Sequence, residues 1–231
     1  MKFTLNPWKQ TGLAVLIILT GTSTVAFAAE KSGAVSGNIT ATSTYVWRGL
    51  PQTYDTALQG GLDYSTPQGL HGGVWTSNVA EGSELDVTIG FAGETKGIGF
   101  DVGLIVYTFP QYEAAAGSGQ EFNFNELYAS ISKDMLNARF STSSEAGSYI
   151  EVNANFEKAV AGLDLGLHFG SYDVDADFDG LSYTGGDDYN DYNVSLGTTV
   201  SGFGVTFTLS DTNITDDSYR TFITVSKHFN P

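Results

Sequence analysis

Hydrophobic and polar positions alternate along most of the chain after residue 34. Residues 85–91 read Leu-Asp-Val-Thr-Ile-Gly-Phe, and residues 163–170 read Leu-Asp-Leu-Gly-Leu-His-Phe-Gly. Side chains on a β-strand point alternately to its two faces, so a period of two indicates strands. No stretch keeps the i, i+3, i+4 spacing of an amphipathic helix. The pattern therefore predicts an all-β chain.

The alternation divides the chain into about twelve strands. Tight connections such as Ser201-Gly202 alternate with longer or more polar ones such as 109–120 and 173–187. This alternation of short and long connections is typical of antiparallel outer-membrane barrels, although eight strands remain an alternative. The predicted strands are 35–48, 56–66, 70–78, 84–93, 99–108, 121–132, 135–144, 149–157, 162–172, 188–200, 203–211 and 218–229.

One face of these strands is apolar and the other carries Ser, Thr, Asn, Asp and Gly. In a soluble sandwich the apolar face forms the core, whereas in a membrane barrel it faces lipid and the polar face lines the lumen. Aromatic residues near the predicted strand ends favour the barrel. We expect Tyr45, Trp47 and Trp75 to belong to an aromatic girdle at the membrane interface.

Arg48 is unusual because it directly follows the apolar run Tyr45-Val-Trp47. Alternation along a first strand that reaches residue 48 directs Arg48 into the lumen near one end of the barrel. There it could line the mouth or constriction and influence which ions pass. The alternative is a structural arginine that pairs with carboxylates and braces the first loop.

The N-terminus has the composition of a secretory signal peptide. Lys2 and Lys9 precede a short apolar core, and Ala26-Phe-Ala28 is a small-x-small cleavage site. We therefore expect residues 1–28 to be removed and residues 29–231 to form a single outer-membrane β-barrel domain.

The charge of the remaining chain is strongly acidic. Removing two lysines leaves eight basic against 26 acidic residues, a formal charge of −18. Such a surface repels nucleic acid, so no nucleic-acid partner is expected. Cysteine is absent from the sequence, which excludes thiol chemistry and cysteine metal sites.

The last predicted strand resembles the C-terminal strand by which the barrel assembly machinery recognises outer-membrane proteins. It ends in an aromatic residue, Phe229, although Asn230 and Pro231 follow. Lys227 falls on its lipid-facing side, which is tolerable where the side chain can reach the membrane interface.

A second resemblance covers residues 43–79. Ser43-Thr-Tyr-Val-Trp-Arg-Gly49, Gln59-Gly-Gly-Leu-Asp-Tyr64 and Gly72-Gly-Val-Trp-Thr-Ser-Asn-Val79 resemble the N-terminal signature of the proteobacterial TorF-family porins. Trp47 stands where Phe is common in that pattern. The resemblance implies an outer-membrane β-barrel and does not imply a particular solute.

Other candidate sites are weak. Asp175, Asp177, Asp179 and Gly180 match the opening of a calcium loop, but Gly186 occupies the position of the required Glu, so a solvated acidic loop is the main alternative. His71, His168 and His228 lack metal-ligand spacing. His168 with Ser171 lacks the motif of a lipid-acting enzyme. No catalytic residue, metal site or cofactor is predicted.

The sequence thus predicts an outer-membrane porin in the bacterial outer-membrane lipid that passes small hydrophilic solutes by passive diffusion. The acidic charge favours cations or neutral solutes over anions. A non-conducting structural or adhesive barrel is the first alternative. A lipid-acting barrel enzyme and a soluble periplasmic sandwich are more distant ones.

Overall fold

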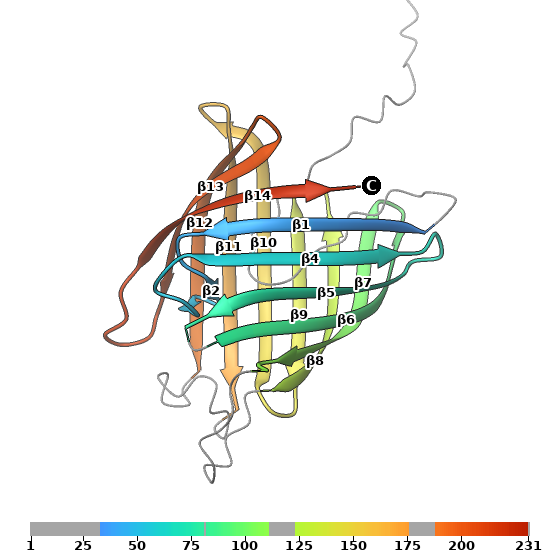
Figure 1. Ribbon diagram of the computed structural model, residues 1–231, viewed down its shortest axis with the longest axis horizontal. Helices are drawn as coiled ribbons and strands as arrows, with labels where there is room; N and C mark the ends of the chain where they lie inside the picture. Colours follow the sequence, from blue (N-terminus) through green and yellow to red (C-terminus); the bar gives the residue numbers. More distant parts are fainter. Residues whose placement is uncertain (1–32, 81, 111–122, 176–187, 231) are drawn as a thin grey trace, which may run out of the picture.

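Twelve antiparallel strands form a closed barrel in the computed structural model, which describes residues 33–80, 82–110, 123–175 and 188–230 (Figure 1). The barrel closes where β1 pairs with β14. The predicted strand number and antiparallel arrangement are confirmed. The wall strands are β1 (Ala34–Thr42), β4 (Ala57–Ser65), β5 (Leu70–Val79), β6 (Gly82–Thr95), β7 (Ile98–Thr108), β8 (Phe124–Lys133), β9 (Leu136–Ser143), β10 (Gly147–Val160), β11 (Leu163–Val174), β12 (Tyr189–Val200), β13 (Phe203–Thr212) and β14 (Arg220–Phe229).

The two ends of the barrel differ in their connections. Short turns join β4 to β5, β6 to β7, β8 to β9, β10 to β11 and β12 to β13, and we call this the turn end. Lys96-Gly97, Ala161-Gly162 and Ser201-Gly202 each have positive φ at both residues. That is the backbone of a type I′ turn, whose twist matches the strands it joins. The opposite end, where β1 ends at Thr42 and β7 ends at Thr108, is the loop end.

The wall has an apolar exterior and a polar interior. On β1, Ile39 is 60% exposed whereas the neighbouring Thr40 is fully buried. The same alternation places Leu58, Leu62, Val87, Ile89, Leu127 and Ile150 outside, and Asn38, Gln59, Ser141, Asn193, Ser195 and Ser210 inside. This distribution is inverted relative to a soluble protein and is that of a barrel surrounded by lipid.

Lys227 lies on the exterior of β14, as its predicted register requires. Its Nζ donates a hydrogen bond to the carbonyl of Gly202 at 2.9 Å and lies 5.2 Å from the centre of the Phe203 ring. Both partners belong to the turn end, so the charge reaches the edge of the apolar band.

No helix within the described ranges is long and apolar enough to cross a membrane. The predicted signal peptide, residues 1–28, lies outside the described residues. The first predicted strand is too long, because β1 ends at Thr42 and the chain leaves the wall there. Residues 45–51 of the segment that follows lie in the lumen.

Candidate functional site: a lumen filled by a hairpin

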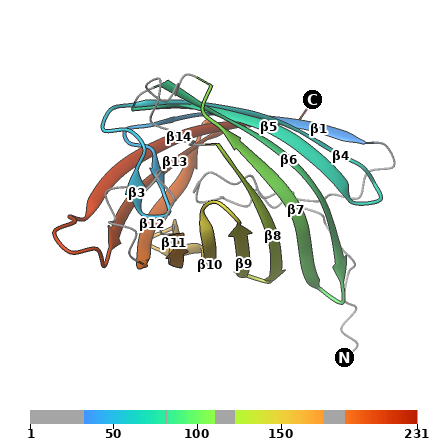
Figure 2. The same cartoon turned by 90° about the horizontal axis from the view of Figure 1, so that it is seen from below.

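A small hairpin folds into the barrel between β1 and β4. It consists of β2 (Val46–Trp47) and β3 (Leu50–Pro51), which pair only with each other. Arg48 and Gly49 join them with φ of 47° and 80°, a fourth turn of the type I′ kind. Figure 2 shows this hairpin, in blue, inside the ring of wall strands. We call residues 45–51 the plug.

The plug is embedded in aromatic side chains. Tyr45 is 2% exposed and Trp47 8% exposed. The Trp47 ring lies about 6 Å from three rings of the wall, those of Tyr107, Phe124 and Tyr172. These rings belong to one hydrophobic cluster that crosses the lumen and that also includes Leu50, Trp75, Tyr149 and Tyr189.

The predicted girdle of Tyr45, Trp47 and Trp75 is therefore wrong. Trp75 is 7% exposed, and its ring contacts the Tyr45 ring edge-on at 5.7 Å inside the barrel. Tyr45 and Trp47 follow the end of β1, so the alternation of that strand no longer decides which way they point. The physical reason is that these rings gain more contact in the lumen, against other rings, than on the lipid side of a strand.

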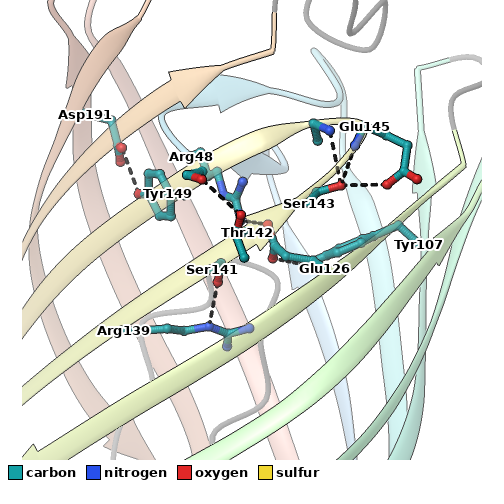
Figure 3. Close-up of polar contacts among 12 residues, drawn as sticks. Arg48, Tyr107, Glu126, Arg139, Ser141, Thr142, Ser143, Glu145, Tyr149 and Asp191 are labelled. Atoms are coloured by element: carbon teal, nitrogen blue, oxygen red, sulfur yellow. Dashed lines mark hydrogen bonds and ion pairs between the residues drawn. The ribbon is translucent and has the colours of Figure 1, made fainter.

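Arg48 lies inside the barrel and is 5% exposed. Its Nη2 donates to Glu126 Oε1 at 2.5 Å, and the Tyr107 hydroxyl donates to the other oxygen of Glu126 at 3.3 Å (Figure 3). The guanidinium also lies 4.4 Å from the ring centre of Trp47 and 4.3 Å from that of Tyr149. The predicted route to this position is wrong, because Arg48 lies in the turn between β2 and β3 and not on the first strand. Its role at a constriction remains a prediction.

The barrel wall holds both carbonyls of the plug turn. Tyr189 donates from its hydroxyl to the Arg48 carbonyl at 2.9 Å, and Arg220 donates from Nη1 to the Gly49 carbonyl at 2.5 Å. Donors from β12 and β14 thus satisfy groups that would otherwise be unpaired in the lumen. The plug is fixed at its tip as well as along its rings.

Gly49 is required by this close approach, and Gly49→Ala is expected to destabilise the barrel by about 2–4 kcal/mol. A Cβ there would meet Asp191 Cβ at 2.5 Å and Thr212 Cγ2 at 2.7 Å, in a backbone of positive φ. Gly97→Ala is the matched control, since its φ is similar and no atom lies within 4 Å of its Cβ. Urea unfolding of both variants checks the difference; equal losses would mean that only backbone strain matters.

Asp217, in the loop between β13 and β14, contacts Arg220, the residue that donates to the plug carbonyl of Gly49. It forms an ion pair with Arg220, and it accepts a hydrogen bond from the Thr212 hydroxyl at 2.5 Å. Partial burial acts to raise its pKa, but these hydrogen bonds and the Arg220 charge outweigh burial and hold the pKa of Asp217 below its usual value.

Acidification is therefore expected to loosen this loop. The pKa of this carboxylate is lower in the folded protein than in the unfolded chain, where it is about 3.9. Its contribution to stability is therefore complete above about pH 3.9 and is lost as the pH falls through the folded-state pKa. Hydrogen exchange of the Asp217 amide, which donates to the Ile214 carbonyl at 3.2 Å, should accelerate in that range after correction for intrinsic rates. In Asp217→Asn this step should be absent; a step that persists would point to another group.

Two histidines belong to polar networks of the wall. His168 Nε2 contacts Asp191 Oδ1 at 2.8 Å and its Nδ1 contacts Asn153 Oδ1 at 2.7 Å, while the Tyr149 hydroxyl donates to Asp191 Oδ2 at 2.8 Å. His71 Nε2 contacts Asp101 at 2.9 Å. The described residues contain no group of three or more potential metal ligands among His, Asp and Glu side chains.

The weaker predicted sites are only partly visible. Ser171 alternates with the inward-facing His168 and Tyr172 on β11, so it lies on the opposite face from His168. Asp177 and Asp179 of the calcium-loop candidate lie outside the described residues, whereas Asp175 follows the end of β11.

Charged residues on the inner face of β6, β8 and β9 were missed by sequence reasoning. They are Glu84, Asp86, Glu126 and Arg139, each less than a tenth exposed. Arg139 donates from Nε to Ser141 at 3.1 Å (Figure 3). Its guanidinium lies 4.0 Å from the centre of the Tyr128 ring. The sequence does contain a signal for these inward charges. In Phe124-x-Glu126-x-Tyr128, a charged residue alternates with aromatic residues on the same face of the strand.

The chain is similar to a bacterial protein family and to solved porin structures. A family model described as a bacterial protein of unknown function (Gcw_chp) matches residues 27–230. The KdgM porin has a TM-score of 0.56 at 9% identity, over 85% of this chain and 99% of that chain. The NanC porin has a TM-score of 0.52 at 8% identity, over 86% of this chain and 100% of that chain. No curated protein matches in sequence. At these identities the structural similarity describes the fold.

Proposed function

The chain belongs to the Gcw_chp family of bacterial proteins of unknown function, and we propose that it is an outer-membrane porin for small hydrophilic solutes. The observation that carries the proposal is the closed twelve-strand barrel with an apolar exterior and a polar interior. Its similarity in fold to the KdgM and NanC porins supports the same function.

The lumen is proposed to favour cations or neutral solutes. Acidic side chains outnumber arginines on the inner face of the described wall, and the whole chain carries a formal charge of −16. A lumen with surplus negative charge lowers the barrier for cations and raises it for anions. The inward acidic residues include Glu84, Asp86, Asp101, Glu126, Glu151 and Asp191.

The plug favours a second candidate function, a non-conducting structural barrel. The ring cluster spans the lumen at the level of Arg48, and its members Tyr45, Trp47 and Leu50 are each less than a tenth exposed. A hydrophobic constriction of this kind excludes water and ions unless it moves. The two functions differ in whether the plug leaves the lumen.

Reconstitution in a planar bilayer under a salt gradient tests the proposal. We expect channels whose reversal potential has the sign of cation selectivity. Channels that prefer anions would contradict the proposed selectivity, and a folded barrel without channels would favour the structural function. Folding is monitored separately by heat-modifiable migration on gels.

The remaining assignments belong to the same proposal. They are the membership in the TorF-family porins, the removal of residues 1–28 on export, and recognition of the last strand by the barrel assembly machinery. Recovery of the processed chain in the outer-membrane fraction tests export. A variant that lacks Phe229 and the residues after it tests whether the last strand is recognised by the assembly machinery.

A further inference from the structure

Two carboxylates on β6 lie side by side in the wall next to the plug. Glu84 and Asp86 are two residues apart, both face inward, and they are 3% and 4% exposed. Glu84 lies opposite Ser77 in the register with β5, and Asp86 lies opposite Trp75 on β5 and Tyr107 on β7. They are therefore enclosed by neighbouring strands and by the plug.

Each carboxylate has an oxygen without a partner. Tyr45 of the plug lies beside the Glu84 side chain, but Glu84 Oε2 and Asp86 Oδ1 are buried and have no hydrogen-bond partner among the described residues. A buried carboxylate oxygen normally accepts a hydrogen bond or contacts a cation, because losing water without replacement costs several kcal/mol.

The basic side chains of the lumen do not compensate this pair. Arg48 is bound to Glu126, His71 to Asp101, and His168 to Asp191. No described Lys, Arg or His forms an ion pair with Glu84 or Asp86. Glu126 lies close enough to add to the negative potential at Asp86. Among the described residues, the pair thus has a third carboxylate nearby and no cationic side chain in an ion pair with it.

We propose that Glu84 and Asp86 form a binding site for a hard metal cation, with Ca²⁺ as its preferred occupant. Carboxylate oxygens are the ligands that such cations prefer, and two carboxylates supply up to four of the six to eight oxygens that Ca²⁺ takes. With only two charged ligands the site is a weak one, with a dissociation constant on the order of 10⁻⁴–10⁻³ M. The occupant would hold β6 against the base of the plug through Tyr45. Binding at this site goes beyond the proposed function and does not require conduction.

The test is the thermal stability of the folded full-length protein in detergent at pH 8. Raising CaCl₂ to 10 mM at constant ionic strength should raise the melting temperature by about 3–10 °C. In Glu84→Gln/Asp86→Asn the melting temperature without Ca²⁺ should be higher than in the wild type, because the buried charges are gone, and the rise with Ca²⁺ should vanish. Asp63→Asn is the matched control, an inward carboxylate nearer the turn end, and should keep the rise.

Two results would overturn the site. A wild type that does not respond to Ca²⁺ means that protons neutralise the pair, and a double variant that still responds means that Ca²⁺ binds elsewhere. If the double variant does not fold, Tb³⁺ replaces it as a probe on the wild-type protein. Tb³⁺ emission excited through Trp75 should be displaced by Ca²⁺ and should fall in Trp75→Phe; unchanged emission in that variant would also overturn the site. Because none of these measurements uses a bilayer, failure of the porin function leaves them interpretable.

Discussion

A barrel in which the plug, residues 45–51, is replaced by a short Gly-Ser linker should conduct at least about tenfold better than the wild type, since each 1.4 kcal/mol removed from the barrier to ion entry is a factor of ten. The plug rings occupy the middle of the lumen, and the wall does not need them. β1 pairs directly with β4, from Ala34 opposite Ser65 to Thr42 opposite Ala57. Neither β2 nor β3 pairs with a wall strand. The measurement is single-channel conductance in planar bilayers.

Tyr54→Ser provides the matched control for this replacement. Tyr54 belongs to the same connection between β1 and β4 but is 83% exposed, so its loss changes the loop without emptying the lumen. Its conductance should equal that of the wild type. A linker variant that folds and conducts no better than this control would mean that wall side chains alone close the lumen. It would then support the structural function.

The wall could be predicted from the sequence because each strand carries its own evidence. Ile39 and Thr40 differ in polarity, and the alternation places them on opposite faces of the wall, where they are 60% and 0% exposed. Turns such as Lys96-Gly97 and Ser201-Gly202 are also local signals, since a glycine in the second position adopts positive φ easily. Period and turns together predict a barrel of about twelve strands, which the structure confirms, although they left eight strands as an alternative.

The plug could not be predicted in the same way. Ser43 to Trp47 continue an acceptable alternation, so nothing local ends β1 at Thr42. Whether Trp47 faces lipid or the lumen depends on Tyr107, Phe124 and Tyr172, which are distant in sequence. One local signal was available: Arg48-Gly49 has the x-Gly form of the other two-residue turns, between Val46-Trp47 and Leu50-Pro51.

Glu126→Gln should lower the free energy of unfolding by about 3–5 kcal/mol, the cost typical of breaking a buried ion pair from one side. Arg48 would keep its charge and its place on the rings of Trp47, Tyr149 and Tyr172 while losing its carboxylate partner. Its Nη1 is already buried without a hydrogen-bond partner among the described residues, so little remains to stabilise the charge. Urea unfolding followed by tryptophan fluorescence measures the loss, since Trp47 contacts the guanidinium.

The double variant Arg48→Met/Glu126→Gln tests whether the stability lost in Glu126→Gln comes from leaving the Arg48 charge unpaired. Removing both charges should recover much of the stability, because a methionine fills similar space among the rings without needing a counter-charge. Glu145→Gln, in the exposed connection between β9 and β10, is the control and should change stability by less than about 0.5 kcal/mol. A loss below about 1 kcal/mol in Glu126→Gln would mean that water reaches Arg48, because only a hydrated guanidinium tolerates the loss of its partner so easily. The energy of this pair therefore reports whether the plugged lumen is dry, and a wet plug would leave a path for ions without any movement of the hairpin.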